Sequence, residues 1–188
     1  MSHRHLVLLL LAGAVAAGPG SAPKPEEIDA SIAKGVAWLR SQAKDGMKMK
    51  DQVFPSPGHT ALALSAIASA MPADARVADP FVKKACDFLL KAQRSDGGIG
   101  DPSLGSYDNY FTSSALMALA IVNDPAHAEA REKMKAFLLT LQRKEEGRLK
   151  GGFGYNTSKG ADLSNAQFAI EALRAAGLPE DHPAMVEA

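Results

Sequence analysis

The chain of 188 residues is 46% hydrophobic and 22% charged, an ordinary globular composition with enough length to bury a core. Its 21 basic and 21 acidic side chains cancel without a long run of one sign, which argues against nucleic acid or an anionic membrane as a partner. Aromatic residues are only 6% of the chain, whereas alanine is abundant, and alanine favours closely packed helices. The composition therefore predicts an all-α protein.

The first residues have the features of an export signal. Arg4 provides a short basic start, an apolar run follows from Leu6 to Ala17, and its last three residues form a small-residue cleavage pattern. The run is too short to span a bilayer comfortably, and no later segment is apolar enough to do so. We therefore predict a signal peptide over 1–17, a linker over 18–27 and a secreted or periplasmic protein; the alternative is a buried N-terminal helix.

The chain contains a single cysteine, Cys86. An exported protein with one cysteine has no internal disulfide, so packing must hold the chain together. Cys86 lies in an apolar helical pattern with Ala85 and Leu89. We predict that it is a small core residue and not a reactive thiol or a metal ligand.

Three segments share one pattern, in which a lysine precedes an aromatic residue by four positions and leucine and glutamine follow. The glutamines, Gln42, Gln93 and Gln142, are 51 and 49 residues apart. Behind each glutamine comes a glycine-bearing turn and a second apolar segment. Because both kinds of segment recur at nearly the same period, we predict a repeat protein.

The two segments of each repeat differ in character. The segment around 80–91 is amphipathic, whereas 61–68 is apolar on every side and has to be buried. Each repeat therefore supplies one outer and one inner helix, and stacked pairs form an open solenoid or a closed ring. We place the repeats at 28–78, 79–123 and 124–178, with the start of a fourth behind them.

Residues that begin and end helices occur at the boundaries of these repeats. Asp79-Pro80 and Asp124-Pro125 are typical of helix starts, and Ser164 and Gln167 have capping-box spacing at the third inner helix. Gly177 is expected to end that helix. His182-Pro183 opens a further outer helix and the sequence stops soon after, so we expect it to belong to a longer protein.

The second repeat carries a specific resemblance. Lys84, Phe88 and Gln93, followed by Asp96-Gly97-Gly98-Ile99-Gly100, resemble the glutamine-containing repeat of squalene and terpene cyclases. That family has an (α/α) toroid, which it shares with protein prenyltransferase β subunits. The resemblance implies that 28–188 form part of an (α/α)6 toroid, and it is closest to exported bacterial squalene-cyclase-like proteins, for which it implies no particular reaction. Ile99 stands where the family has tryptophan.

The catalytic motifs of these families are absent from the sequence. Class II terpene cyclases protonate an alkene with an Asp-x-Asp-Asp motif, and Asp101, Asp108 and Asp162 stand apart from one another. Prenyltransferases bind zinc with Asp, Cys and His, whereas Cys86 is predicted on an outer helix. We therefore predict no metal site and no cofactor, and leave open whether the protein is an enzyme.

Polar and aromatic residues gather just before the predicted inner helices. Tyrosine beside Asn and Asp suits a carbohydrate or a lipid headgroup. The alternative is a local role, in which Asp108, Ser164 and Gln167 cap helices and the tyrosines seal a loop. The candidate ligand-binding residues are His59, Tyr107, Asp108, Asn109, Tyr110, Tyr155, Asp162, Asn165 and Gln167.

The sequence leaves three functional hypotheses. The first is an exported toroid that binds a small-molecule or protein ligand where these loops meet. The second is an enzyme, either a terpene-type cyclase or a polysaccharide-active toroid, with its catalytic residues in repeats outside this sequence. The third is a repeat module that makes protein contacts.

Overall fold

The computed structural model of the chain describes residues 22–42, 56–100, 107–157 and 160–188. Regular structure in these ranges is helical throughout, without a strand, which confirms the predicted all-α class. The predicted signal peptide (1–17) lies outside the described residues. The first helix begins at Pro25, within the predicted linker.

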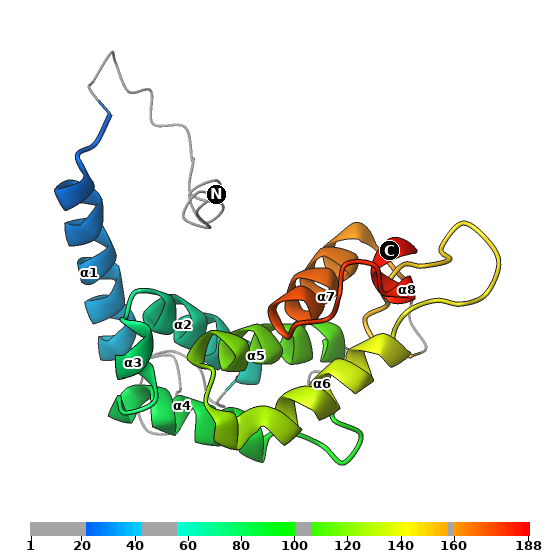
Figure 1. The fold of residues 1–188 in the computed structure, drawn as a ribbon, viewed down its shortest axis with the longest axis horizontal. Coiled ribbons are helices and arrows are strands. Elements are labelled where there is room, and N and C mark those ends of the chain that lie inside the picture. Colours follow the sequence, from blue (N-terminus) through cyan, green and yellow to red (C-terminus); the bar gives the residue numbers. More distant parts are fainter. Residues whose placement is uncertain (1–21, 43–55, 101–106, 158–159) are drawn as a thin grey trace.

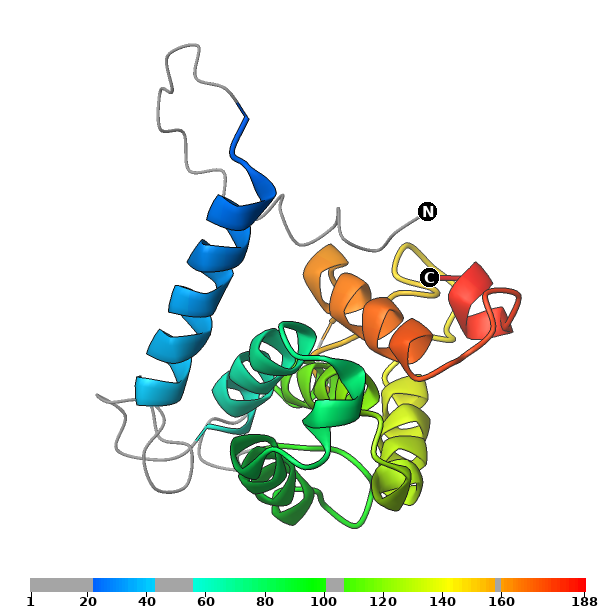
Figure 2. The ribbon, with the colours of Figure 1, turned by 60° about the vertical axis from the view of Figure 1, so that its left-hand side comes forward.

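The inner and outer helices alternate along the chain. In chain order the helices are α1 (Pro25–Gln42), α2 (Pro57–Ser69), α3 (Ala73–Arg76), α4 (Pro80–Lys91), α5 (Asp108–Val122), the short 3-10 helix η4 (Pro125–His127), α6 (Ala128–Thr140), α7 (Leu163–Ala175) and α8 (Pro183–Val186). Helix α5 is central, because it packs against α2, α6 and α7 (Figures 1 and 2).

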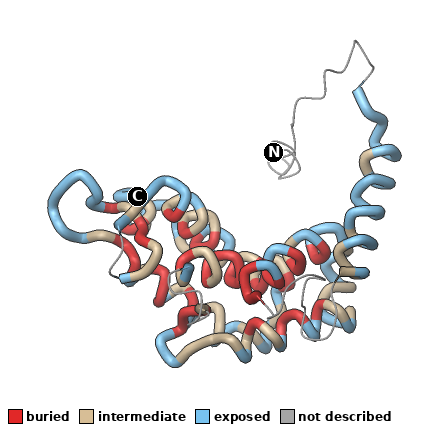
Figure 3. The backbone as a smooth tube through the Cα atoms, turned by 180° about the vertical axis from the view of Figure 1, so that it is seen from behind, coloured by how far each residue is buried: buried red, intermediate tan, exposed pale blue. Residues whose placement is uncertain are grey.

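The core lies along the inner helices α2, α5 and α7 (Figure 3). Ala115, Leu116, Ala118 and Leu119 of α5 have no exposed surface. Alanine at two of these four positions lets neighbouring helices approach closely, because it has no side chain beyond Cβ. Neighbours on several sides of α5 account for this burial. The prediction that 61–68 is buried on every side is wrong in part, because in α2 Leu62 is 51% exposed and Ala66 is exposed, on a side that α5 does not cover.

The outer helices α4 and α6 bury only one face. In α4 this face consists of Val82, Ala85, Cys86 and Leu89, which confirms the predicted core position of the cysteine. Burial, together with the negative charges of Asp87 and Asp124, raises the pKa of the Cys86 thiol to about 12. A thiol in this environment stays protonated and is a poor nucleophile or metal ligand.

The first outer helix, α1, has no buried residue and projects from the body of the molecule (Figures 1 and 2). An ion pair links its last turn to the start of α4, where the guanidinium of Arg40 donates to both carboxylate oxygens of Asp79 at 3.2 and 3.0 Å. Arg40 also lies over the ring of Phe81, 5.1 Å from its centroid. The contact between α1 and the body is therefore concentrated at one end of the helix.

Two of the three predicted helix starts have the expected caps. Asp79 accepts hydrogen bonds from backbone amides of α4, and Asp124 accepts one from Ala126 at the start of η4. The prediction of a capping box that starts at Ser164 is wrong. Asp162 caps α7 instead, because its carboxylate accepts from the amide of Asn165 at 2.8 Å and Ser164 lies inside the first turn.

Two of the three repeated glutamines, Gln93 and Gln142, join successive outer helices, whereas Gln42 Nε2 donates to the hydroxyl of its neighbour Ser41 at 3.2 Å. Gln93 Nε2 donates to the carbonyl oxygens of Gly97 at 3.1 Å and of Ala130, in α6, at 2.9 Å. Gln142 Nε2 donates in the same way, at 2.9 Å in both cases, to Gly151 and to Ala184 of α8. Gln93 and Gln142 therefore each fix the turn behind their own helix and the first turn of the next outer helix.

The glycine in each of these turns is a steric requirement. Gly97 and Gly151 have φ angles of 91° and 82°, which side-chain-bearing residues rarely adopt. A Cβ atom on Gly97 would lie 2.3 Å from the carbonyl oxygen of Lys133, and one on Gly151 would lie 1.7 Å from that of Glu187. The turns pack so closely on the next outer helix that only glycine fits.

We expect Gly97→Ala to lower the free energy of unfolding by about 2 kcal/mol or more, because the substitution adds backbone strain and a clash with backbone atoms. Urea unfolding followed by circular dichroism measures the effect. Gly160→Ala is the matched control, since nothing lies within 4 Å of the added Cβ and its φ is not positive. Equal stability of the two variants would show that the turn does not require glycine.

Candidate functional site

The N-terminal ends of the three inner helices lie together. Asn109, at the start of α5, donates from Nδ2 to the backbone oxygen of Asn165 in α7 at 3.2 Å. On the other side, Phe111 of α5 packs against Gly58 of α2, where a Cβ atom would be only 2.6 Å from the ring. The loops that precede these helices therefore share one end of the helical array.

Five aromatic side chains form a cluster at this end, which we call the aromatic cluster. Tyr110 is central, with ring centroids 5.7 Å from Tyr155 and 5.0 Å from Phe168, both in edge-on arrangements. Tyr107 lies 6.1 to 6.4 Å from Tyr110, Phe111 and Tyr155. These are normal contact distances for aromatic pairs, so the rings pack on one another and form a continuous surface.

The aromatic cluster is accessible from outside. Tyr107 is 48% exposed, and Tyr110, Tyr155 and Phe168 are half-buried. Leu163, in the first turn of α7, is 89% exposed. A ligand would meet the outer surface of the rings, since the contact distances leave no enclosed space between them.

Asp162 adds a negative charge beside the aromatic cluster. Its pKa lies below the ordinary value of 3.8, because the amide and the side chain of Asn165 and the hydroxyl of Tyr155 donate hydrogen bonds to it. The same hydrogen bond and the charge of Asp162 raise the pKa of Tyr155 above 10.0. At neutral pH the site therefore pairs a carboxylate with a protonated phenol.

The two candidate asparagines are buried and have structural roles. Asn109 is fully buried and donates to the carbonyl oxygens of Gly154 at 2.8 Å and Asn165 at 3.2 Å, while its Oδ1 accepts from Ser113. Asn165 is also fully buried and donates from Nδ2 to Asp162 at 3.0 Å. Both hold the loops that carry Tyr155 and Asp162, and neither faces solvent.

Three further candidates lie outside the aromatic cluster. Asp108 pairs with Arg94 at 3.2 Å, and this arginine also binds Asp96. Gln167 is exposed and donates to Glu171, one turn further along α7, at 3.2 Å. His59 is exposed in the first turn of α2, where its backbone amide donates to the N-cap Ser56.

The sequence interpretation missed Phe111, Phe168 and Leu163. Phe111 and Phe168 occupy helical positions that sequence reasoning assigns to the core. The sequence does hold one signal, since Phe111 follows Tyr107 by four residues and such residues lie on the same face of a helix. No equivalent signal places Phe168 beside Tyr110, because that contact depends on how α5 and α7 pack.

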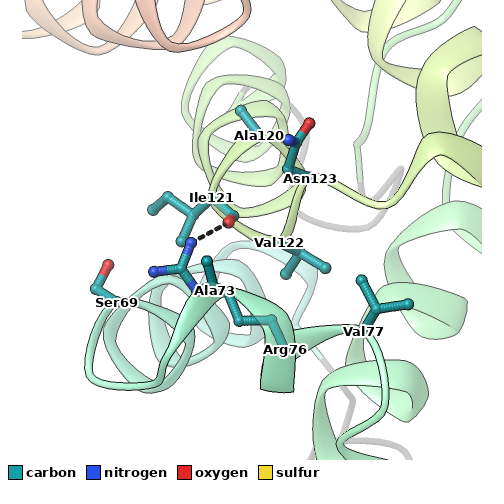
Figure 4. Close-up of a pocket in the computed structure, with 8 residues that line it drawn as sticks. All are labelled: Ser69, Ala73, Arg76, Val77, Ala120, Ile121, Val122 and Asn123. Carbon is teal, nitrogen blue, oxygen red and sulfur yellow. Dashed lines mark hydrogen bonds between the residues drawn. The ribbon is translucent and has the colours of Figure 1, made fainter.

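A pocket of about 460 Å³ lies at the opposite ends of α2 and α5 (Figure 4). Arg76 crosses it and donates to the backbone oxygens of Ile121 at 2.7 Å and Met71 at 3.3 Å. The arginine therefore binds the carbonyl groups at the C-terminal ends of two helices. None of the predicted ligand-binding residues lines this pocket.

Neither metal ligands nor a membrane span is found in the part of the chain that the structure describes. It contains no group of three or more His, Cys, Asp or Glu residues with the arrangement of a metal site, and no helix long and apolar enough to cross a bilayer.

No protein-family model matches the chain, and no curated protein is significantly similar to it in sequence.

The lowered pKa of Asp162 predicts how stability depends on pH. A carboxyl group whose pKa is lower in the folded state stabilises the protein above its unfolded pKa, and this contribution is lost as the pH falls towards the folded pKa. We expect the free energy of unfolding to fall between about pH 5 and pH 3, and to fall less steeply in Asp162→Asn. Urea titrations across this range measure both slopes.

The hydroxyl of Tyr155 contributes to this shift, so Tyr155→Phe should move the pKa of Asp162 back towards 3.8. NMR titration of the carboxyl carbon gives the value directly. Tyr107→Phe is the control, because Tyr107 is not among the groups that shift this pKa. An unchanged titration in Tyr155→Phe would contradict the assigned hydrogen bond.

Proposed function

We propose that this chain is an exported repeat protein whose helix pairs belong to an (α/α) toroid, and that it binds a carbohydrate on the aromatic cluster. The observation that supports a carbohydrate is an accessible group of three tyrosine rings in contact with one another, one of which, Tyr155, is hydrogen-bonded to the charged Asp162. The toroid rests on the repeat pattern and on its resemblance to squalene and terpene cyclases.

The chemistry of the cluster suits a sugar ring. The C–H groups of a pyranose pack against the exposed face of an aromatic ring, as other apolar groups do. Phenol groups donate and accept hydrogen bonds, and a carboxylate accepts them from sugar hydroxyls. Tyr107 provides the exposed ring, and Asp162, hydrogen-bonded to the neighbouring Tyr155, provides the acceptor.

Two other ligand classes fit less well. A phosphate-bearing lipid headgroup would be repelled by Asp162, and the nearby Arg94 is already bound by Asp96 and Asp108. A quaternary ammonium group needs an open aromatic cage, whereas ring centroids 5.0 to 6.4 Å apart leave no space between the rings.

Asp162 is also poorly suited to protonate a substrate. A general acid needs a pKa near or above the working pH, whereas hydrogen bonds lower the pKa of Asp162 and keep it ionised. The described residues therefore favour binding over acid catalysis at this position.

We expect Tyr107→Ala to weaken carbohydrate binding about tenfold or more, because it removes the most exposed ring. Isothermal titration calorimetry with soluble hexasaccharides of β-1,4-linked glucose, β-1,4-linked N-acetylglucosamine and α-1,4-linked glucose tests this. Tyr107→Phe keeps the stacking surface and should retain most of the affinity. Absence of binding to all three probes at millimolar concentration, or equal affinity of Tyr107→Ala and the unaltered protein, would contradict the proposal.

A further inference from the structure

Two aspartates occupy equivalent places at the starts of two inner helices. Asp108 begins α5 and Asp162 caps α7, and they are 54 residues apart, which is also the spacing between matching core residues of these helices, Ala115 and Ala169. Both carboxylates lie at a helix N-terminus, so the two helix dipoles favour their negative charges in the same way. A difference in how the two charges are balanced therefore comes from their other neighbours.

In the second repeat an arginine balances the charge of the aspartate. Arg94, which directly follows the repeated glutamine Gln93, pairs with Asp108 at 3.2 Å and with Asp96 at 3.0 Å. Its guanidinium also lies over the ring of Phe137, 5.2 Å from the centroid, so the arginine is held in place from several sides. The side chain of Asp108 is only 25% exposed. The chain therefore neutralises this carboxylate and partly covers it.

In the third repeat the corresponding arginine makes a different contact. Arg143 also follows the repeated glutamine, but the turn behind it is longer, and its Nη1 donates to the backbone oxygen of Thr157 at 3.0 Å. Among the described residues, the groups that lower the pKa of Asp162 are backbone amides of α7 and the side chains of Asn165 and Tyr155, none of which is positively charged. Asp162 is also exposed. The third repeat therefore presents to solvent a charge that the second repeat balances internally.

Hydroxyl groups connect the carboxylate of Asp162 to the aromatic cluster. The hydroxyl of Tyr155 donates to Asp162, and the hydroxyl of Tyr110 is hydrogen-bonded to that of Tyr155. The ring of Tyr155 lies 6.4 Å from that of Tyr107, the most exposed ring of the cluster. A sugar chain that stacks on Tyr107 and extends over Tyr155 therefore brings its substituents within reach of Asp162.

We infer that the carbohydrate bound by the aromatic cluster is an amino sugar, whose protonated amine pairs with Asp162 as Arg94 pairs with Asp108. This inference rests on the proposed carbohydrate function and specifies its ligand. β-1,4-linked glucosamine has both features that the site requires, since its pyranose rings stack on tyrosines and its ammonium groups donate charged hydrogen bonds to a carboxylate.

The charge of Asp162 distinguishes this ligand from a neutral sugar. A sugar hydroxyl also donates to a carboxylate but leaves its charge unbalanced, whereas a primary ammonium group balances the charge and has three N–H donors. A primary ammonium group binds the exposed carboxylate from outside the aromatic cluster. It therefore needs no open cage between the rings, in contrast to a quaternary ammonium group.

Isothermal titration calorimetry with two hexasaccharides of the same linkage tests the inference, with β-1,4-linked glucosamine compared to β-1,4-linked N-acetylglucosamine. At about pH 6 the sugar amines are protonated and Asp162 is ionised, because its pKa lies below 3.8. We expect the glucosamine hexasaccharide to bind at least about fivefold more tightly, as an exposed ion pair permits. This preference should shrink as the salt concentration rises, because salt screens exposed charges.

Two matched variants assign the preference to one carboxylate. Asp162→Asn removes the charge and keeps a side chain that caps α7, so its affinities for the two hexasaccharides should differ by less than about twofold. Asp108→Asn is the control, because it removes an equivalent charge that Arg94 already balances, and it should keep the preference for glucosamine. Tyr107→Ala should weaken the binding of both hexasaccharides and leave their ratio unchanged.

The outcomes separate this inference from the proposed function. Equal affinity of the unaltered protein for the two hexasaccharides would overturn the inference and leave carbohydrate binding in place. A preference that persists in Asp162→Asn, or that disappears in Asp108→Asn, would overturn it as well, and so would a lysine hexapeptide that binds as tightly as the glucosamine hexasaccharide. If neither hexasaccharide binds at millimolar concentration, the proposed function fails and the inference fails with it.

Discussion

The buried central helix α5 imposes the constraint on which the rest of the structure depends. A helix with neighbours on several sides has to satisfy its own polar groups internally. Thr112 does so by binding the amide and the carbonyl of Ile99, and Asn109 does so by binding Gly154 and Asn165. These bonds reach the loops in front of the inner helices. The amide of Asn109 also donates to the carbonyl of Tyr155, so the residues that satisfy α5 also position the aromatic cluster.

Features that depend on local chemistry are predictable from the sequence. Asp79 and Asp124 cap helices because aspartate before proline is a local signal. The spacing of the glutamines predicts a repeat, and Gln93 and Gln142 do occupy equivalent places in successive helix pairs. Features that depend on helix packing are not predictable in this way. Asn109 is a natural candidate for ligand binding because it is polar, but the approach of α7 buries it. The place of Phe168 in the aromatic cluster is not predicted, because an apolar helical residue is normally assigned to the core.

The ion pair between Arg40 and Asp79 has a consequence for local stability. Asp79 is also the N-cap of α4. Burial acts to raise the pKa of its carboxyl group, but hydrogen bonds from Arg40 and from backbone amides outweigh this effect, so the pKa lies below its ordinary value. Because α1 buries no residue, its described side-chain contacts with the body centre on Arg40, which also touches Phe81 and Met71. We therefore expect α1 to open as a unit of its own, and its amide hydrogens to exchange with solvent long before those of α5.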